Sequence, residues 1–321
     1  MAVNPYIYWV DLLLSLFTGW AAFIALVNTS DVLLKVVTYL VAVFAFLRAI
    51  GFIHEISHQS KGRYADFMRQ FRTVWNLVVG VPFMLSSPFY TCHLAHHSVN
   101  TFGTKEDPQY MYIKGQPDRM LEFLIIQALR STLLLALRVI VFVPLSLFVR
   151  PLRIRLEEKH SSIGEPDYKT SFSDEDKIIL LCNDIMSSLF WYAMIYLVYL
   201  GHISFYTLGT LYSVIFGVML VNAFRVLGEH TYDQHRYDSE ENAQMRVFLN
   251  TYNYTKGGIL IDLLYNTGLR YHALHHYLPQ IPYHNLPKAH RILVQNLAPD
   301  SLYHSVEAKG HIANIRSLVR N

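Results

Sequence analysis

The chain has 321 residues, of which 52% are hydrophobic and only 16% are charged, and its mean hydropathy is +0.23. A charged fraction well below the usual quarter, together with apolar runs of about twenty residues, excludes intrinsic disorder and favours an integral membrane protein. The formal net charge is only +3 and no segment is dense in Lys and Arg, so nucleic acid is not an expected partner. Cys92 and Cys182 lie far apart, so the sequence predicts neither a disulfide framework nor a thiolate metal site.

Several apolar segments are long enough to cross a bilayer as helices. The connections Asn28–Asp31 and Gly201–His202 are too short to hold a domain, so the segments must pair into two hairpins. The predicted spans are residues 6–27, 32–53, 178–200 and 203–227. We therefore predict an all-α integral membrane protein with four transmembrane helices, forming a single domain over residues 1–321.

The distribution of Lys and Arg predicts the orientation of these hairpins. Neither short turn contains Lys or Arg, and 25 of the 27 such residues lie outside residues 32–53. The positive-inside rule then places both termini and the large polar segments in the cytosol. Lys35, near the outer end of the second span, can reach the interface with its long side chain. The sequence leaves open whether the membrane is a cell inner membrane or the endoplasmic reticulum.

Two further apolar stretches are harder to assign. Residues 121–149 are apolar enough to span, but they carry Arg130 and Arg138 at unfavourable depths. A crossing here would also invert the next hairpin, so we predict an interfacial or re-entrant helix. Residues 76–90 are short and interrupted by Pro82 and Pro88, which again favours an interfacial helix.

Histidine is the unusual residue, with sixteen copies. Three clusters stand out on the predicted cytosolic side, with the sequences HEISH, HLAHH and HALHH. Their histidines are His54 and His58, then His93, His96 and His97, then His272, His275 and His276. Spacings of three and four place side chains on the same face of a helix, so each cluster would direct two or three imidazoles to one point. Two HxxHH matches in one chain are rare by chance, and we predict a cytosolic helical cap that holds a metal site.

Besides the three clusters, a fourth segment is expected to supply a ligand just after the last span. His230 directly follows the predicted end of that span, and His235 is an alternative five residues later. Isolated histidines are more often exposed or hydrogen-bonded than metal ligands. We therefore expect the following six histidines to be exposed or hydrogen-bonded and not to bind metal: His160, His202, His284, His290, His304 and His311.

The number of imidazoles indicates which metal they bind. A zinc ion prefers four ligands and has no redox chemistry, so eight or nine histidines exceed what one zinc could use. Two iron ions share such a set more naturally, and open positions on iron permit oxygen chemistry. Ligating histidines need partners on their second nitrogen, and the candidate acceptors are Glu55, Asp107, Glu229 and Asp262.

The three histidine boxes, in this order and with these separations, resemble those of the membrane fatty acid desaturase superfamily over about residues 45–295. The stretch RYHALHHYLP at residues 270–279, followed by IPYHNL, is similar to bacterial-type acyl desaturases, as is Asp107-Pro108 after the second box. This resemblance implies a non-haem di-iron centre whose ligands are the eight histidines of the boxes and His230.

The chain also departs from that family. Some members place an asparagine one turn before the isolated histidine, where this sequence has Val226; Asn222 and Asn266 are candidate substitutes. No HPGG motif of a fused cytochrome b5 is present, so electrons would come from a separate donor of the ferredoxin, rubredoxin or cytochrome b5 type. The other implied partners are O2, the lipid bilayer and an acyl lipid, acyl-CoA or acyl-carrier substrate.

We therefore expect O2-dependent desaturation of an acyl chain, giving a cis double bond. The ligand sequence does not separate this outcome from hydroxylation of a lipid or alkyl chain, which is the alternative. The first box also matches HExxH, the signature of a zinc protease, but that interpretation leaves the other two boxes without a role. A histidine-lined metal transporter is weaker, since transport sites lie near the middle of the membrane.

Overall fold

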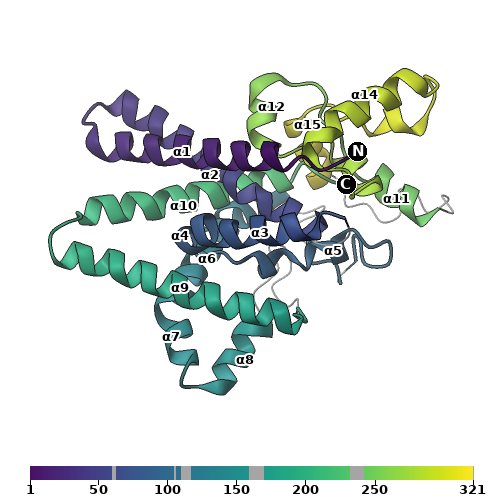
Figure 1. Ribbon diagram of the computed structural model, residues 1–321. Helices are drawn as coiled ribbons and strands as arrows, with labels where there is room; N and C mark the ends of the chain where they lie inside the picture. Colours follow the sequence, from purple (N-terminus) through teal and green to yellow (C-terminus); the bar gives the residue numbers. More distant parts are fainter. Residues whose placement is uncertain (60–62, 105, 110–116, 159–169, 232–241, 321) are drawn as a thin grey trace.

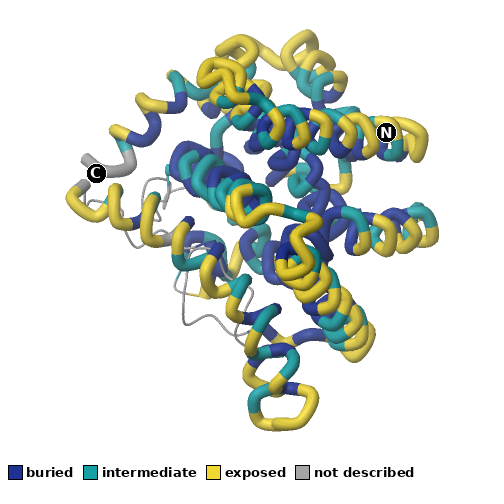
Figure 2. The backbone as a smooth tube through the Cα atoms, turned by 90° about the vertical axis from the view of Figure 1, so that its left-hand side faces the viewer, coloured by how far each residue is buried: buried dark blue, intermediate teal, exposed yellow. Residues whose placement is uncertain are grey.

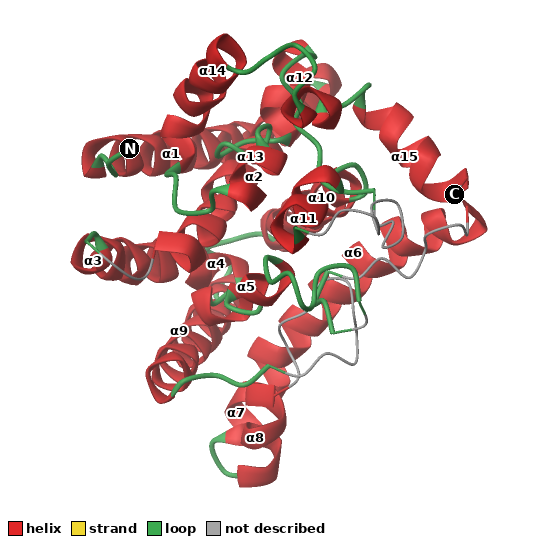
Figure 3. Ribbon diagram, turned by 90° about the vertical axis from the view of Figure 1, so that its right-hand side faces the viewer, coloured by secondary structure: helices red, strands yellow, loops and turns green. Residues whose placement is uncertain are grey.

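The computed structural model describes residues 1–59, 63–104, 106–109, 117–158, 170–231 and 242–320. Within these ranges the regular structure is entirely helical, and the extended pairing consists of three isolated bridges (Figure 3). The predicted all-α class is confirmed for this part of the chain.

In the described part of the chain, five helices are long and apolar enough to cross a membrane. They are α1 (Pro5–Asn28), α2 (Val32–Gln59), the helix Met120–Ser146, α9 (Asp174–Tyr199) and α10 (Phe205–Val226). The third of these is continuous but contains a π-helical segment: α6 (Met120–Leu137) leads through η4 (Arg138–Phe142) into α7 (Val143–Ser146). The protein is thus a multi-pass membrane protein.

Local sequence signals explain where these helices begin. The side chain of Asn4 accepts a hydrogen bond from the backbone N–H of Tyr6, and a proline opens α1. Ser173 caps α9 in the same way and is followed by three acidic residues in the first turn. Those acidic residues favour the positive end of the helix dipole. Ser204 provides the corresponding cap for α10.

The two expected hairpins are present, α1 with α2 and α9 with α10, and both of their turns lie at the same end of the molecule (Figure 1). The chain termini lie at the opposite end. Lys35, near the start of α2, places its ammonium 5.4 Å from the centre of the Tyr206 ring at the start of α10. This cation–π contact joins the turn ends of the two hairpins and accommodates the one charge that fitted the second span poorly.

The structure does not confirm a count of four spans, because Met120–Ser146 meets the same criteria of length and composition as the other four. The sequence argument against it depended on Arg130 and Arg138 and on the inversion of the next hairpin that a crossing would cause. Arg138 is buried, and its guanidinium donates two hydrogen bonds to Asp184 of α9, at 3.0 and 2.7 Å, and one to the carbonyl of Leu156. A charge inside an apolar helix is tolerated when it is paired in this way. Its partner lies 46 residues away, so sequence spacing gave no sign of it.

The second doubtful stretch is a bent pair of helical segments. The first arm is α3 (Ala65–Trp75), η1 (Asn76–Gly80) and α4 (Val81–Phe83), and the second is η2 (Ser87–Tyr90) with α5 (His93–His96). The two arms meet at 93°. The chain turns at Met84, whose φ of 59° is in the left-handed region and ends the first arm. The predicted interruption of residues 76–90 is therefore present, and it directs α5 toward the end of α2.

The remaining helices are short and gather near the chain termini (Figure 1). They are η3 (Pro117–Arg119), α8 (Arg150–Glu158), α11 (Ala243–Leu249), α12 (Gly258–Leu264), α13 (His272–Tyr277), η5 (Tyr283–Asn285), α14 (Leu286–Asn296), η6 (Leu302–Val306) and α15 (His311–Arg320). Of these, α8 lies apart, beside α7.

The largest apolar core joins α1, α2, α3 and α10, with Phe46, Phe71 and Val214 among its fully buried members. The outward faces of the long helices remain exposed (Figure 2). Phe17 and Phe205, for example, are 74% and 82% exposed. Such surfaces suit a hydrocarbon environment. Packing of the inner faces of the long helices brings the final turns of α2 and α10 close together, next to the short helices near the chain termini.

Candidate metal centre

Nine buried or half-buried histidines converge at the end of the molecule opposite the hairpin turns, and they form two separate groups. The five-histidine group contains His54, His58, His93, His97 and His275. The four-histidine group contains His96, His230, His272 and His276. Within each group the candidate ligand nitrogens all lie within 4.8 Å of one another. The structure thus brings together every histidine of the three boxes and His230.

Helical spacing explains how the boxes divide between the two groups. His54 and His58 are four residues apart on the last turns of α2 and share a group. In each HxxHH box, the two histidines four residues apart also stay together, whereas the middle one joins the other group. His96 therefore leaves the five-histidine group and His275 leaves the four-histidine group. Each box thus directs two imidazoles to one group, the lower of the two or three expected from the spacing, and the two HxxHH boxes exchange their middle histidines.

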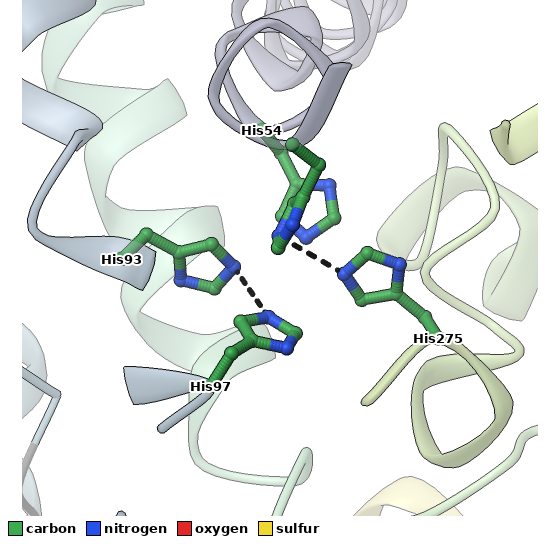
Figure 4. Close-up of side chains that lie close together, drawn as sticks. His54, His93, His97 and His275 are labelled. Carbon is green, nitrogen blue, oxygen red and sulfur yellow. Dashed lines mark hydrogen bonds between the residues drawn. The ribbon is translucent and has the colours of Figure 1, made fainter. Parts of the chain in front are cut away.

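Nitrogens in the five-histidine group face each other at short range (Figure 4). Nε2 of His93 lies 2.9 Å from Nε2 of His97, and Nε2 of His275 lies 3.2 Å from Nε2 of His58. Neighbouring ligands of one ion with bonds of about 2.0–2.1 Å are separated by about 3 Å. The arrangement has the dimensions of a metal site.

The four-histidine group is built in the same way. Nε2 of His230 lies 3.0 Å from Nε2 of His96 and 3.2 Å from Nε2 of His272. Neither ring nitrogen of His276 has a hydrogen-bond partner, although this residue is 1% exposed. A buried polar atom without a partner costs about 1–3 kcal/mol, and a bound cation would remove that cost.

The electrostatics of this group favour neutral imidazoles. Burial lowers the pKa of His230, His272 and His276 well below the usual value for histidine, and neighbouring histidines act in the same direction. The neutral form is the form that binds metal, since its free nitrogen carries a lone pair. Both groups therefore fit two metal ions in their number of donors, spacing and charge state.

Hydrogen bonds outside the group fix which nitrogen of His96 faces the centre. Both carboxylate oxygens of Asp107 lie close to Nδ1 of His96, at 2.9 and 3.0 Å, and both residues are fully buried. A carboxylate accepts the Nδ1 proton, so Nε2 is left with its lone pair toward the group. Backbone N–H groups of Gly103 and Gln109 also donate to Asp107. Among the predicted acceptors, Asp107 has the geometry expected of a partner that orients a ligand.

The other predicted acceptors lie differently. One oxygen of Glu229 is 4.0 Å from Nε2 of His272, and the other accepts a hydrogen bond from Arg225. Asn222 also accepts a bond from Arg225. Glu229 thus lies at the border of the four-histidine group, and its ion pair is with Arg225 outside that group.

Asp262 and Asn266 make no described contact with a histidine. Asp262 pairs with Arg270 and is half-exposed. Asn266 donates to the carbonyl of Leu263, and its side chain lies beside Gly51 of α2. Val226, one turn before His230, where the resemblance led us to look for an asparagine, is buried in an apolar cluster. We found no substitute for that asparagine among these residues.

Glu55 bears on the protease alternative. Its Oε2 accepts hydrogen bonds from the hydroxyl of Tyr8, at 2.5 Å, and from the backbone N–H of Tyr283, at 3.2 Å. Its other oxygen is 3.8 Å from Nδ1 of His54. A protease glutamate must activate a metal-bound water, whereas this carboxylate holds α1 and the segment after the third box against α2. The geometry disfavours a zinc protease.

Two contacts were not anticipated from the sequence. The side-chain amide of Gln109 lies 3.1 Å from Nδ1 of His93. The hydroxyl of Thr251 lies 3.1 Å from Nδ1 of His230 and donates its proton to the carbonyl of Val247. Because that proton is already used, the Thr251 oxygen acts as an acceptor toward Nδ1 of His230, and the backbone of Asn250 is a second hydrogen-bond partner of this histidine. Gln109 could have been inferred from its position two residues after Asp107, but Thr251 carries no local signal.

The isolated histidines largely behave as expected. His284 accepts a hydrogen bond from the backbone N–H of Asn4, and His290 pairs with the hydroxyl of Tyr303. His202 is exposed in the α9–α10 turn. His311 is buried next to Tyr265.

His160 and His235 lie outside the described residues, so the alternative to His230 stays untested.

The fold and the two histidine groups define a class of protein, the membrane-bound oxidoreductases with a histidine-rich two-metal site. Comparison with known sequences identifies the family. Residues 30–307 match the sequence model described as "Fatty acid desaturase", and the chain therefore belongs to this family of membrane desaturases and hydroxylases. The predicted resemblance is confirmed.

A curated relative provides a more specific comparison. The chain is 34% identical over 323 aligned residues to a protein named "Ceramide hydroxylase" from Caulobacter vibrioides (strain NA1000 / CB15N). The alignment covers 100% of this chain and 90% of the relative. The protein is thus an enzyme of the desaturase and hydroxylase superfamily, and the finding favours the hydroxylase alternative at least as much as desaturation.

Proposed function

We propose that the protein hydroxylates a ceramide-like membrane lipid, in a reaction that uses O2 at a centre of two iron ions. The observation that carries this proposal is the full-length similarity to a ceramide hydroxylase, in a chain whose nine histidines form two groups of metal-site dimensions. Desaturation of an acyl chain, expected first from the sequence, is the second candidate and is supported by the name of the matching family.

Iron suits the two groups better than zinc does. Nine imidazoles exceed what one or two tetrahedral zinc ions need, and zinc cannot take part in redox steps. Iron supplies the capacity to activate O2 and to cleave an unactivated C–H bond, which amino-acid side chains lack. In hydroxylation, one oxygen atom enters a C–H bond of the lipid and the other leaves as water. This balance requires two electrons and two protons from an external reductant.

The protein's own contribution is to hold the ligands neutral, oriented and shielded from water. Asp107 and Thr251 keep the Nε2 atoms of His96 and His230 free to bind metal. The four-histidine group is entirely buried, whereas His58 and His97 of the five-histidine group are only half-buried. We assign the approach of lipid and O2 to this more open edge.

The membrane arrangement supports a lipid substrate. The histidines lie beyond the apolar parts of α2 and α10, so a lipid in the near leaflet would present its chain from the membrane side. We place both termini and the active site in the cytosol, because neither hairpin turn contains Lys or Arg. The electron donor would be a separate carrier of the ferredoxin, rubredoxin or cytochrome b5 type.

The test is a lipid profile by mass spectrometry. Membranes containing the wild-type protein or His275→Ala would be supplied with an N-acyl sphingoid lipid, O2 and a reducing system. The expected product is one oxygen atom heavier than the substrate, appears only with the wild type, and carries label from ¹⁸O2. A product two hydrogens lighter would instead establish desaturation. If neither forms with any donor class while iron is bound, the proposed substrate is wrong.

A further inference from the structure

The C-terminal helix α15 packs against the segment that carries His230. His311, Asn314 and Ile315 lie on one face of this helix and are 7%, 6% and 6% exposed. Ile315 packs with Ala223, Val226 and Leu227 at the end of α10. His311 and Asn314 lie beyond residues 30–307, the part that matches the family. The face is therefore a feature of this chain that the family match does not include.

Gly228, in the turn after α10, is enclosed by these side chains. A Cβ atom on this residue would lie 2.3 Å from Nδ1 of His311 and 2.7 Å from the hydroxyl oxygen of Tyr265. The hydroxyl of Tyr265 is in turn 2.7 Å from Nδ1 of His311. Real Cβ contacts are never this close, so only glycine fits, and the turn cannot shift without moving both side chains.

The backbone of the same turn is also held. The carbonyl of Gly228 accepts a hydrogen bond from the hydroxyl of Tyr254, at 2.6 Å. That hydroxyl accepts a bond from the amide of Asn314, at 2.8 Å. The rings of Tyr254 and Tyr265 stack with centres 4.1 Å apart. We call the four side chains of Tyr254, Tyr265, His311 and Asn314 the Gly228 clamp.

The clamp acts on a segment that is fixed on its other side as well. Glu229 and His230 follow Gly228 directly, and the Tyr252 N–H donates to the carbonyl of Glu229 at 3.0 Å. His230 forms an isolated bridge with Thr251. No member of the clamp belongs to either histidine group. The segment that delivers His230 is thus held between α15 and the chain after α11.

We propose that the Gly228 clamp is a set of positioning residues for the four-histidine group, through which α15 sets the place of His230 and the affinity of that group for its metal. The inference depends on the proposed function, because it requires two metal sites. A purely structural role would instead make α15 a packing element that stabilises the whole fold. A positioning role predicts that weakening the clamp releases only the ion of the four-histidine group. A purely structural role predicts that both ions are lost equally.

The test measures iron content and iron release in purified protein. The variants are His311→Ala, which opens the clamp, and Tyr254→Phe, which keeps the ring and removes the hydrogen bond to Gly228. His304→Ala is the matched control, a histidine of the same terminal region whose ring contacts Tyr303. We expect the clamp variants to release one of two irons to a chelator up to about fivefold faster, the effect of losing one hydrogen bond of about 1 kcal/mol that positions the segment before His230. His304→Ala should release both as the wild type does.

The outcomes separate the inference from the proposed function. Selective loss of one iron, with an unchanged melting temperature of the metal-free protein, supports the clamp. His311→Asn should partly restore retention, because its side chain can still bond to Tyr265. Equal loss of both irons, or wild-type retention in both clamp variants, would overturn the inference. Failure of the wild type to bind two irons would overturn the proposed function itself.

Discussion

The five-histidine and four-histidine groups use the same donor atom but differ in what surrounds it. In the four-histidine group every member is buried, and acceptor side chains, Asp107 and Thr251, fix two of the rings. In the five-histidine group His58 and His97 are half-buried. The described outer partner of that group is the amide of Gln109 on His93. If each group holds an iron ion as proposed, we expect the four-histidine group to retain its ion and the five-histidine group to exchange it more readily.

Under the proposed function both groups take part in the reaction, so we expect removal of one ligand from either group to give the largest effect. We expect His275→Ala and His272→Ala each to lower product formation below detection and iron content to about one ion per chain, since each belongs to a different group. Product by mass spectrometry and iron by elemental analysis measure this. His202→Ala, in the exposed α9–α10 turn, should match the wild type. Two irons retained in either ligand variant would remove that histidine from the site.

The next largest effect concerns the side chains that hydrogen-bond to the histidines from outside each group, Asp107 on His96 and Gln109 on His93. Asp107→Asn keeps the shape of the side chain but loses the charge that holds the Nδ1 proton of His96. We expect metal affinity of the four-histidine group to fall about 10–100-fold. Gln109→Ala removes a neutral partner from the more open group and should cost less, under about tenfold. Titration with ferrous ion under anaerobic conditions measures both. A larger effect for Gln109 would contradict the proposed order.

The nine histidines show how far sequence reasoning reaches in this protein. Spacings of three and four within a helix are local, so the boxes and the span end before His230 were sufficient to collect all nine. The division into two groups depends on how α5 and α13 approach each other in space. Spacing within one segment of the sequence does not predict this approach. His96 and His275 therefore belong to a different group from the other two histidines of their boxes, a division that the spacing within each box left open.

The membrane fold shows the same limit. Hydropathy marked all five long helices as apolar enough to span, and the fifth was interpreted as interfacial because of Arg130 and Arg138 and because a crossing would invert the next hairpin. Its partner Asp184 lies on another helix, and only the packed structure reveals that the pair is buried and bidentate. A charged residue in an apolar segment thus does not decide whether the segment crosses the membrane until its partner is known. Thr251 was missed for the same reason, since its contact with His230 joins residues 21 positions apart.

Exposure of the five-histidine group predicts how iron leaves the protein. A strong chelator added to the reduced enzyme should remove iron in two phases, the faster from the group with half-buried ligands. Asp107→Asn should accelerate only the slower phase, which assigns that phase to the four-histidine group. Absorbance of the ferrous chelate over time gives both rates. A single phase in the wild type, unchanged in the variant, would show that the two groups do not differ in access.

The smallest expected effect concerns a single hydrogen bond. Thr251 donates its only hydroxyl proton to the carbonyl of Val247, so it accepts from Nδ1 of His230 and holds Nε2 free for metal. Thr251→Val keeps the shape and removes that bond, whereas Thr251→Ser retains the hydroxyl. A bond of about 1 kcal/mol predicts that the valine variant loses about fivefold in the affinity of the four-histidine group and that the serine variant stays near the wild type. Ferrous ion titration of both variants measures this. Equal losses in both would mean that the methyl group of Thr251, rather than its hydroxyl, positions His230.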